Sequence, residues 1–165
     1  MTPYVFREAR RDDLDALVAM LADDVLGATR EDTSRPLNTL YVDAWDAIAR
    51  DPNNELIVCE DGAAIAGMLQ LTFIPYLTHT GRWRGLIEGV RVANSHRGQG
   101  LGRQLLEWTI ARAAGRGCML IQLTSDKRRT DAIRFYENLG FSATHEGLKL
   151  EIGSRGDSRA RLEQD

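Results

Sequence analysis

Cysteine is scarce in this sequence, with only two residues, Cys59 and Cys118, among 165. They form neither a C-x-x-C unit nor an evenly spaced set, so a disulfide framework is not indicated. We predict two reduced core thiols in a cytosolic protein. Histidine is also rare, and the three histidines share no spacing, so no metal site is predicted.

Long apolar runs and an excess of basic charge are missing as well. No segment approaches the ~20 apolar residues that cross a bilayer, and the first residues, MTPYVFREARRDD, lack the apolar run of a signal peptide. The net charge is −3, with 21 basic and 24 acidic residues interspersed, which argues against a general nucleic-acid binder. We therefore predict a soluble, cytoplasmic protein that binds neither a membrane nor nucleic acid.

The length and composition fit one folded domain. An apolar share of 43% in 165 residues is normal for a globular protein that folds without disulfides or a structural metal. We predict one domain over residues 1–153. The polar remainder, residues 154–165, is predicted to be a disordered tail.

Hydrophobic periodicity predicts a mixed α/β sheet covered by helices. Strands are expected at 4–8, 55–60, 64–73, 84–92, 119–123 and within 141–152. Helices are expected from residue 12 or 13, at 40–50, from 101 to about 116, and at 130–139. The Asp61-Gly62 pair predicts a tight hairpin turn, and the apolar run at 119–123 predicts a buried strand.

The most specific local feature is the glycine-rich run Arg97-Gly98-Gln99-Gly100-Leu101-Gly102, placed between a strand and a helix. Glycines let the backbone approach a ligand closely, and free amides at a helix start suit a pyrophosphate. The run lacks the Gly-Lys-Ser/Thr end of a P-loop and the spacing of a dinucleotide fingerprint. A purely structural turn remains the alternative.

Two motifs together resemble the GCN5-related N-acetyltransferase (GNAT) superfamily. Arg97, Gly100 and Gly102 match its Arg/Gln-x-x-Gly-x-Gly/Ala signature. A second block, Ala-x-x-x-Tyr-x-x-x-Gly-Phe, is matched at the expected separation by residues 132–141.

The resemblance implies a fold, a co-substrate and a binding site. The fold is a twisted mixed sheet of six to seven strands with about four helices, splayed between its fourth and fifth strands. Acetyl-CoA would lie in that opening, with no metal involved. The implied cofactor-binding residues are Val90, Arg91 and Val92 for the pantetheine and thioester, and Arg97, Gly98, Gln99, Gly100, Leu101 and Gly102 for the pyrophosphate.

The sequence departs from the family pattern at one place. Many relatives carry Asn three residues before the alanine that matches Ala132, whereas this chain has Arg129, so the resemblance does not carry over an asparagine contact. The basic triplet Lys127-Arg128-Arg129 could approach the 3′-phosphate of CoA, or it could be a solvated loop.

Tyr136 and Glu88 are the candidate catalytic residues. A phenol stays protonated at neutral pH and can donate to a thiolate, and the family places a tyrosine at this position as the acid. Alternation along residues 86–92 puts Glu88 on one face with Val90 and Val92, where burial would make its carboxylate a useful base. A core aromatic and a structural carboxylate are the alternatives.

The predicted function is transfer of an acetyl group from acetyl-CoA to a primary amine by direct attack in a ternary complex, with the Val90 amide as oxyanion donor. A non-catalytic acyl-CoA sensor and a protein for another phosphate ligand remain alternatives, whereas Ser125 has no evident triad partner for a hydrolase. Arg82, Trp83 and Arg84 could gather an anionic group of the acceptor, or form a solvent-facing hairpin. A small-molecule acceptor is favoured, and relatives that form dimers make a homodimer one option.

Overall fold

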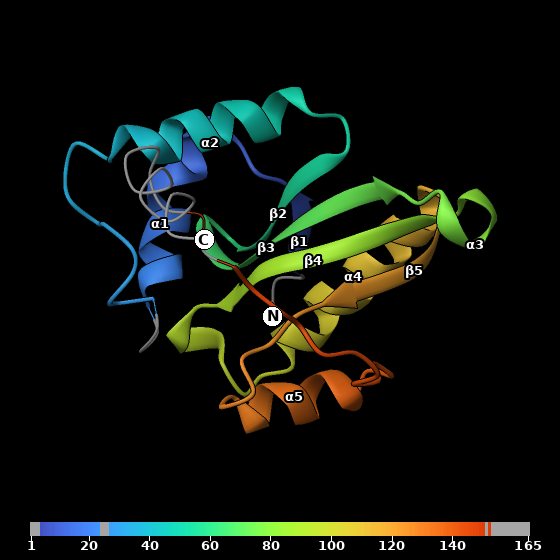
Figure 1. The fold of residues 1–165 in the computed structure, drawn as a ribbon. Coiled ribbons are helices and arrows are strands. Elements are labelled where there is room, and N and C mark those ends of the chain that lie inside the picture. Colours follow the sequence, from blue (N-terminus) through green and yellow to red (C-terminus); the bar gives the residue numbers. More distant parts are fainter. Residues whose placement is uncertain (1–3, 24–26, 151, 153–165) are drawn as a thin grey trace, which may run out of the picture. The chain divides into compact units, whose positions relative to one another are not determined.

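A five-stranded mixed sheet organises the first of two units into which the chain divides, residues 1–128. The computed structural model describes residues 4–23, 27–150 and 152. The sheet order is β1-β2-β3-β4-β5, with three antiparallel pairings followed by a parallel β4–β5 pairing (Figure 1). The strands are β1 (Val5–Glu8), β2 (Asn54–Asp61), β3 (Ala64–Pro75), β4 (Trp83–Val92) and β5 (Cys118–Leu123).

The helices of this unit lie between the strands in the sequence and differ greatly in length. They are α1 (Leu14–Ala22), α2 (Thr39–Arg50), α3 (Thr78–Gly81) and α4 (Leu101–Gly115), with short 3₁₀ turns at Arg11–Asp13 and Asn94–His96. The second unit, residues 129–165, contains α5 (Thr130–Glu137). No helix in the described ranges combines the length and the apolar character that crossing a bilayer requires.

The α4 helix covers one face of the sheet (Figure 1). A Cβ atom placed on Gly67 of β3 would lie 3.4 Å from Leu105, and one on Gly85 of β4 would lie 3.5 Å from Ala113, so glycines permit this close packing. The apolar face of α4 is formed by its fully buried side chains, Leu101, Leu105, Leu106, Thr109 and Ala113. Leu69, Leu71 and Ile87, also fully buried, complete the core.

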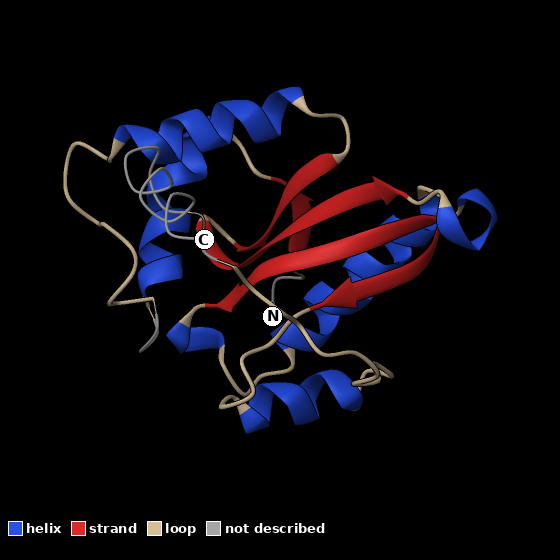
Figure 2. Cartoon of the chain, viewed as in Figure 1, coloured by secondary structure: helices blue, strands red, loops and turns tan. Residues whose placement is uncertain are grey.

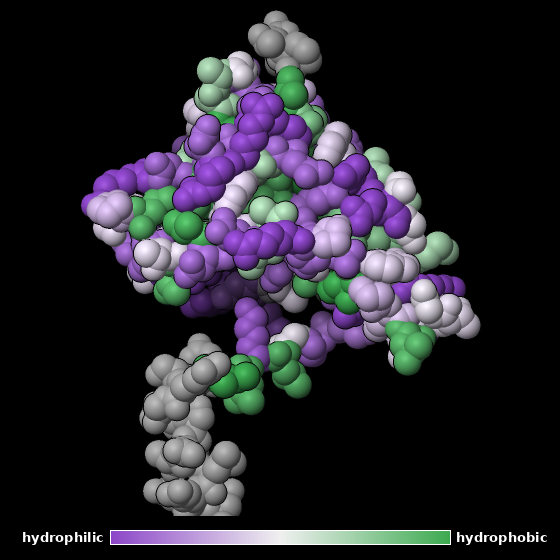
Figure 3. Space-filling model, turned by 90° about the horizontal axis from the view of Figure 1, so that it is seen from above, coloured by the Kyte–Doolittle hydropathy of each residue, from purple (hydrophilic) through white to green (hydrophobic). Residues whose placement is uncertain are grey.

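The α1 and α2 helices lie on the other face (Figure 2). Leu17 and Met20 of α1 form a buried cluster with Val58 and Met68, which are paired across β2 and β3, and Trp45 of α2 packs against it. No residue of α2 is buried, and from its side the surface is mostly hydrophilic with scattered hydrophobic side chains (Figure 3). The two helices therefore cover this face around Val58 and Met68.

The predicted α/β class and mixed sheet are confirmed, but the expected strand count is not. The described part of the chain has five strands rather than six to seven, and five α-helices rather than about four. The expected last strand within 141–152 is absent from residues 141–150 and 152. Leu148, Leu150 and Ile152 alternate as predicted but are 95%, 87% and 86% exposed, because alternation marks a face without supplying a neighbouring strand.

The expectation that β5 is a buried strand is also wrong. Met119 and Leu120 are 69% and 54% exposed. The reason is that β5 pairs only with β4 and is the last strand of the described sheet. The predicted tail, residues 154–165, lies outside the described residues.

An ion-pair cluster at the start of α1 predicts acid sensitivity. Arg7 of β1 binds Asp13 at 2.7 Å and also Glu60, and Asp13 accepts the backbone N–H of Arg10 at 2.6 Å. Hydrogen bonding from Arg7 lowers the pKa of Asp13 and, separately, that of Glu60. A carboxyl with a depressed pKa in the folded state stabilises it above about pH 5, and this contribution is lost as the pH falls further.

We therefore expect Asp13→Asn to lower the free energy of unfolding by about 1 kcal/mol at pH 7 and by almost nothing near pH 2. Urea unfolding of both proteins at a series of pH values measures this difference. The exposed pair Arg50–Asp46 supplies the control Asp46→Asn, which should show little effect at any pH. A cost of Asp13→Asn that stayed constant with pH would contradict the role of the charge.

Candidate active site

The glycine loop has the backbone that a diphosphate site requires. Gly98 and Gly100 have φ angles of +75° and +80°, which side chains other than hydrogen rarely allow. A Cβ atom on either would meet nothing within 4 Å, so both face open space. No side chain caps α4, which begins directly after Gly100, and the first amides of a helix lack intrahelical acceptors. The loop thus presents free amides at the positive end of a 15-residue helix.

The exposed side chain of Arg97 is bonded to three neighbouring residues. Its Nε donates to the Val92 carbonyl at 3.0 Å, its Nη2 donates to the backbone carbonyl of Asp23 at 3.0 Å, and its Nη1 donates to Asn94. Nη2 also pairs with the Asp23 carboxylate at 3.2 Å. Arg97 therefore ties the glycine loop to the end of β4 and to the C-terminal end of α1, so it positions the loop.

Only the first half of β4 pairs with β5. Their parallel pairing runs from Trp83–Cys118 to Ile87–Leu123 and stops there. The rest of β4, from Glu88 to Val92, has no β5 partner, so that edge of the backbone is open. The opening lies in the same strand that leads into the glycine loop.

A β-bulge in β4 corrects the predicted alternation. Glu88 pairs with Gln70, but Arg91 pairs with Met68, so β4 has one more residue than β3 in this interval. Gly89, with a φ of +62°, lies inside it. Leu86 and Glu88 still share a face. Val92 instead lies opposite Gly67, on the α4 face. Because side chains alternate along a strand, Val90 lies on that α4 face as well. The extra residue therefore separates Glu88 from the two valines.

The bulge changes the pairing of Val90. Neither Gly89 nor Val90 has a partner residue in β3, and the carbonyl of Val90 accepts the Arg91 Nη1 at 2.9 Å. An amide outside the sheet ladder can donate to a ligand. Arg91 and Val92 are paired with residues of β3, so of the three predicted residues only Val90 has no partner residue in that strand.

Glu88 is exposed, so the burial expected for a base is absent from this arrangement. It lies on the face away from α4, beside Gln70. Its carboxylate is accessible to an incoming amine, directly or through water.

Tyr136 belongs to the second unit, in the last turn of α5. It is partly buried, and its ring packs edge-on against Phe135 and Phe141, with centroid distances of 5.3 and 5.9 Å. These contacts hold the ring in place. The helix ends one residue later, at Glu137. Its role as the acid stays a prediction.

Arg128 of the basic triplet and Ser125 both have defined surroundings in the structure. Arg128 folds back onto Asp126, with its Nη2 at 2.6 Å from the carboxylate, and this hydrogen bond raises its pKa. Ser125 is not exposed, and its hydroxyl has no hydrogen-bond partner among the described residues. In the described part of the chain, no group of three or more His, Cys, Asp or Glu residues could hold a metal ion.

A polar half of the sheet face opposite α4 was not foreseen. Gln70 and Thr72 of β3 both donate to Oδ1 of Asn54 on β2, at 3.0 and 2.7 Å. Leu86 and Glu88 of β4 are their partners in the next strand. Polar residues on alternate positions of two strands were the available signal, since a sheet face covered by a helix would be apolar there.

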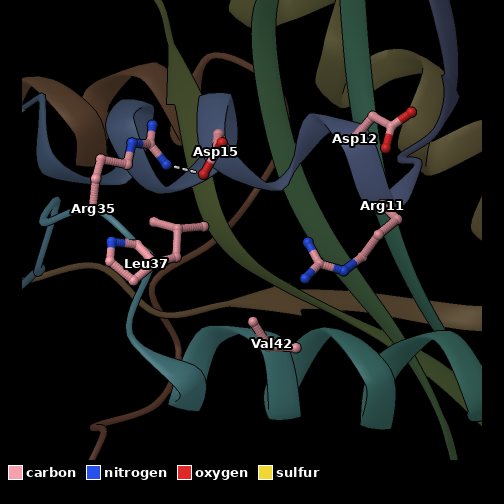
Figure 4. Close-up of a pocket in the computed structure, with 7 residues that line it drawn as sticks. Arg11, Asp12, Asp15, Arg35, Leu37 and Val42 are labelled. Carbon is pink, nitrogen blue, oxygen red and sulfur yellow. Dashed lines mark hydrogen bonds and ion pairs between the residues drawn. The ribbon is translucent and has the colours of Figure 1, made fainter.

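A separate hollow of about 470 Å³ lies among the first 3₁₀ turn, α1 and the beginning of α2 (Figure 4). Arg35 bonds to Asp15 across it, while Arg11 points toward it. It contains none of the predicted catalytic or cofactor-binding residues, and its opposite charges partly satisfy one another, so we assign it no role.

Comparison with known proteins adds independent findings. A family model described as the acetyltransferase (GNAT) family matches residues 19–141. Aminoalkylphosphonate N-acetyltransferase of Salmonella typhimurium is 29% identical over 139 residues, which cover 84% of this chain and 85% of that protein. Glucosamine 6-phosphate N-acetyltransferase of Trypanosoma brucei brucei is 35% identical over 88 residues, 53% of this chain and 58% of that protein.

One solved structure has a higher sequence identity to this chain than either of these two relatives. A protein of Bacillus halodurans C-125 described as a transcriptional regulator is 57% identical, with a TM-score of 0.88. The match covers 91% of this chain and all of that one.

Proposed function

This chain belongs to the acetyltransferase (GNAT) family, and from that premise we propose that it transfers the acetyl group of acetyl-CoA to the primary amine of a small molecule. The observation that carries the proposal is the glycine loop. Two positive-φ glycines precede an uncapped helix, directly after a strand whose far edge is open. These features fit a long ligand with a diphosphate at one end and a polar arm that can bond to a strand edge.

The acetyl-CoA co-substrate supplies the thioester, and the residues of this chain hold and protonate the reacting groups. We propose that the amides of residues 98–102 bind the diphosphate and that the open edge of β4 binds the pantetheine arm. The Val90 amide, which lies in the β4 bulge, would donate to the oxyanion that forms on the thioester carbonyl.

Direct attack requires a neutral amine, but roughly one alkylamine in a thousand is neutral at pH 7. The amine lone pair forms the new C–N bond, and the C–S bond breaks as the tetrahedral intermediate collapses. Glu88, exposed on the face away from α4, would accept the amine proton directly or through water. Tyr136 would give a proton to the departing thiolate.

The relatives support a small acceptor. Both curated relatives are named for acetylation of small amines, an aminoalkylphosphonate and glucosamine 6-phosphate. Each of these names describes an amine that also carries an anionic phosphorus group. This favours a small-molecule acceptor, whose identity these relatives do not fix.

A second candidate is a regulatory module that binds acyl-CoA without turnover. It is favoured by one observation, the 57% identical protein described as a transcriptional regulator. Such a module needs the glycine loop but not Tyr136 or Glu88.

A thiol-release assay with acetyl-CoA and a broad panel of primary amines tests the proposal. We expect CoA release that depends on an amine and yields the acetylated product in equal amounts. Calorimetry with acetyl-CoA alone is the parallel measurement. Binding of acetyl-CoA without turnover of any amine would favour the regulatory module, and no binding at all would remove both functions.

A further inference from the structure

Arg84 is held in a defined position on the sheet face opposite α4. It lies on β4, paired with Ile74 of β3 and Leu120 of β5. Its guanidinium stacks on the ring of Tyr76, with Cζ 4.4 Å from the ring centroid. Nη1 donates to Oε1 of Gln122 at 3.3 Å. Stacking on one side and one hydrogen bond keep the planar group oriented.

This arginine lacks a charge partner. No carboxylate in the described ranges forms an ion pair with it, although Arg7, Arg97, Arg112 and Arg116 each have one. Its Nε is buried and has no hydrogen-bond partner within the described part of the chain. A guanidinium has five N–H donors, so most of the hydrogen-bonding capacity of Arg84 is unused. The group is nevertheless partly removed from water. A desolvated cation without a partner is costly to the fold, so the position suits an anion supplied from outside.

The surroundings of Arg84 lie on the sheet face opposite α4. Leu86 and Glu88 follow it at alternate positions of β4, before the bulge. Asn54, Gln70 and Thr72 line the same face on the next two strands with amide and hydroxyl groups. One end of this polar strip therefore carries the cation, and the other carries the carboxylate proposed to accept the amine proton.

We propose that Arg84 binds an anionic group of the acceptor, so that the preferred substrates are small primary amines bearing a carboxylate, phosphate or phosphonate. This inference rests on the proposed acetyltransferase function. The planar fork binds two oxygens of such a group in parallel. Four residues along a strand span about 13 Å, so the amine near Glu88 and the anion at Arg84 are separated by several bonds.

The test uses three sets of acceptors matched in length, each with spacers from about three to ten carbons, so that the longest approach the ~13 Å between the two residues. They are ω-aminocarboxylic acids, ω-aminoalkylphosphonates, and amino alcohols without charge at the far end. We expect the wild-type protein to acetylate at least one anionic set with a kcat/KM about tenfold or more above that of the alcohols. The two anionic sets show which oxyanion is preferred.

The Arg84→Gln variant should lower kcat/KM for the anionic acceptors by about 10- to 50-fold and leave the amino alcohols nearly unchanged. Arg84→Lys, which keeps the charge but loses the fork, should retain part of the preference. Arg50→Gln is the matched control, because Arg50 is an exposed arginine on α2 paired only with Asp46. Thermal unfolding and the Kd of acetyl-CoA show whether each variant is folded.

Two outcomes overturn the inference while the proposed function stands. One is a wild-type protein whose kcat/KM for amino alcohols equals its kcat/KM for the anionic amines. The other is an Arg84→Gln variant that loses the same factor for both kinds of acceptor. Absence of turnover with every acceptor, despite binding of acetyl-CoA, would instead refute the proposed function.

Discussion

Replacing Tyr136 by phenylalanine is expected to lower kcat by about 100- to 1,000-fold, because a positioned general acid contributes on that scale. The Kd of acetyl-CoA should change by less than about twofold, because the proton is needed only as the C–S bond breaks. The aromatic contacts with Phe135 and Phe141 do not involve the hydroxyl, so the variant should keep the α5 packing. Steady-state kinetics and calorimetry on the same preparation measure the two quantities.

Tyr4 supplies a matched control for this substitution. Its ring packs on His96 at a centroid distance of 6.3 Å, and Tyr4→Phe likewise removes one hydroxyl while keeping a ring contact. We expect this variant to retain the wild-type kcat. If Tyr136→Phe also turned over at the wild-type rate, the thiolate would be protonated by another group or by water, and Tyr136 would be a packing residue.

Local patterns predicted the elements of the first unit well. The β2–β3 hairpin follows directly from two apolar runs around Asp61-Gly62, and Gly62 has the expected positive φ of +61°. The α4 helix begins at Leu101 and ends near the predicted position, since the preceding glycines and the following Gly117 mark both ends. Such features depend on neighbouring residues alone, so one sequence is enough to predict them.

Features that depend on pairing between distant residues could not be predicted in this way. The bulge at Gly89 becomes visible only when β4 is paired with β3, and it reverses the faces of the last residues of β4. The run 141–152 has strand periodicity, but periodicity alone does not supply a partner strand. The place of Arg97 in a motif predicts a diphosphate contact, which stays a prediction, but it says nothing of Asp23, 74 residues away, to which Arg97 bonds.

The sheet face around Arg84 shows the same limit of reasoning from sequence. Arg84 was one of three residues for which an anion-binding role and a solvent-facing hairpin were both open. Stacking on Tyr76 and bonding to Gln122 distinguish it from Arg82, which is exposed. Sequence proximity grouped the three residues together, whereas alternation along β4 and pairing with β5 separate them.

The glycine loop gives the second large expected effect, tested by the double variant Gly98→Ala/Gly100→Ala. Each Cβ would project into the open space that the diphosphate is proposed to occupy, since no protein atom lies within 4 Å of either position. Loss of two charge-assisted hydrogen bonds should raise the Kd of acetyl-CoA by about 100-fold or more. A positive φ adds a conformational cost of about 1–2 kcal/mol at each alanine.

The chain offers a control with the same backbone cost. Gly62 and Gly117 have φ angles of +61° and +81°, and a Cβ atom on either also meets nothing within 4 Å. Gly62→Ala/Gly117→Ala should therefore lose a similar free energy of unfolding but bind acetyl-CoA normally. An S-acetyl pantetheine that lacks the diphosphate should bind the loop variant and the wild-type protein equally. If both double variants weakened acetyl-CoA binding to the same extent, strain would explain the loss, and the amides of the loop would have no special role.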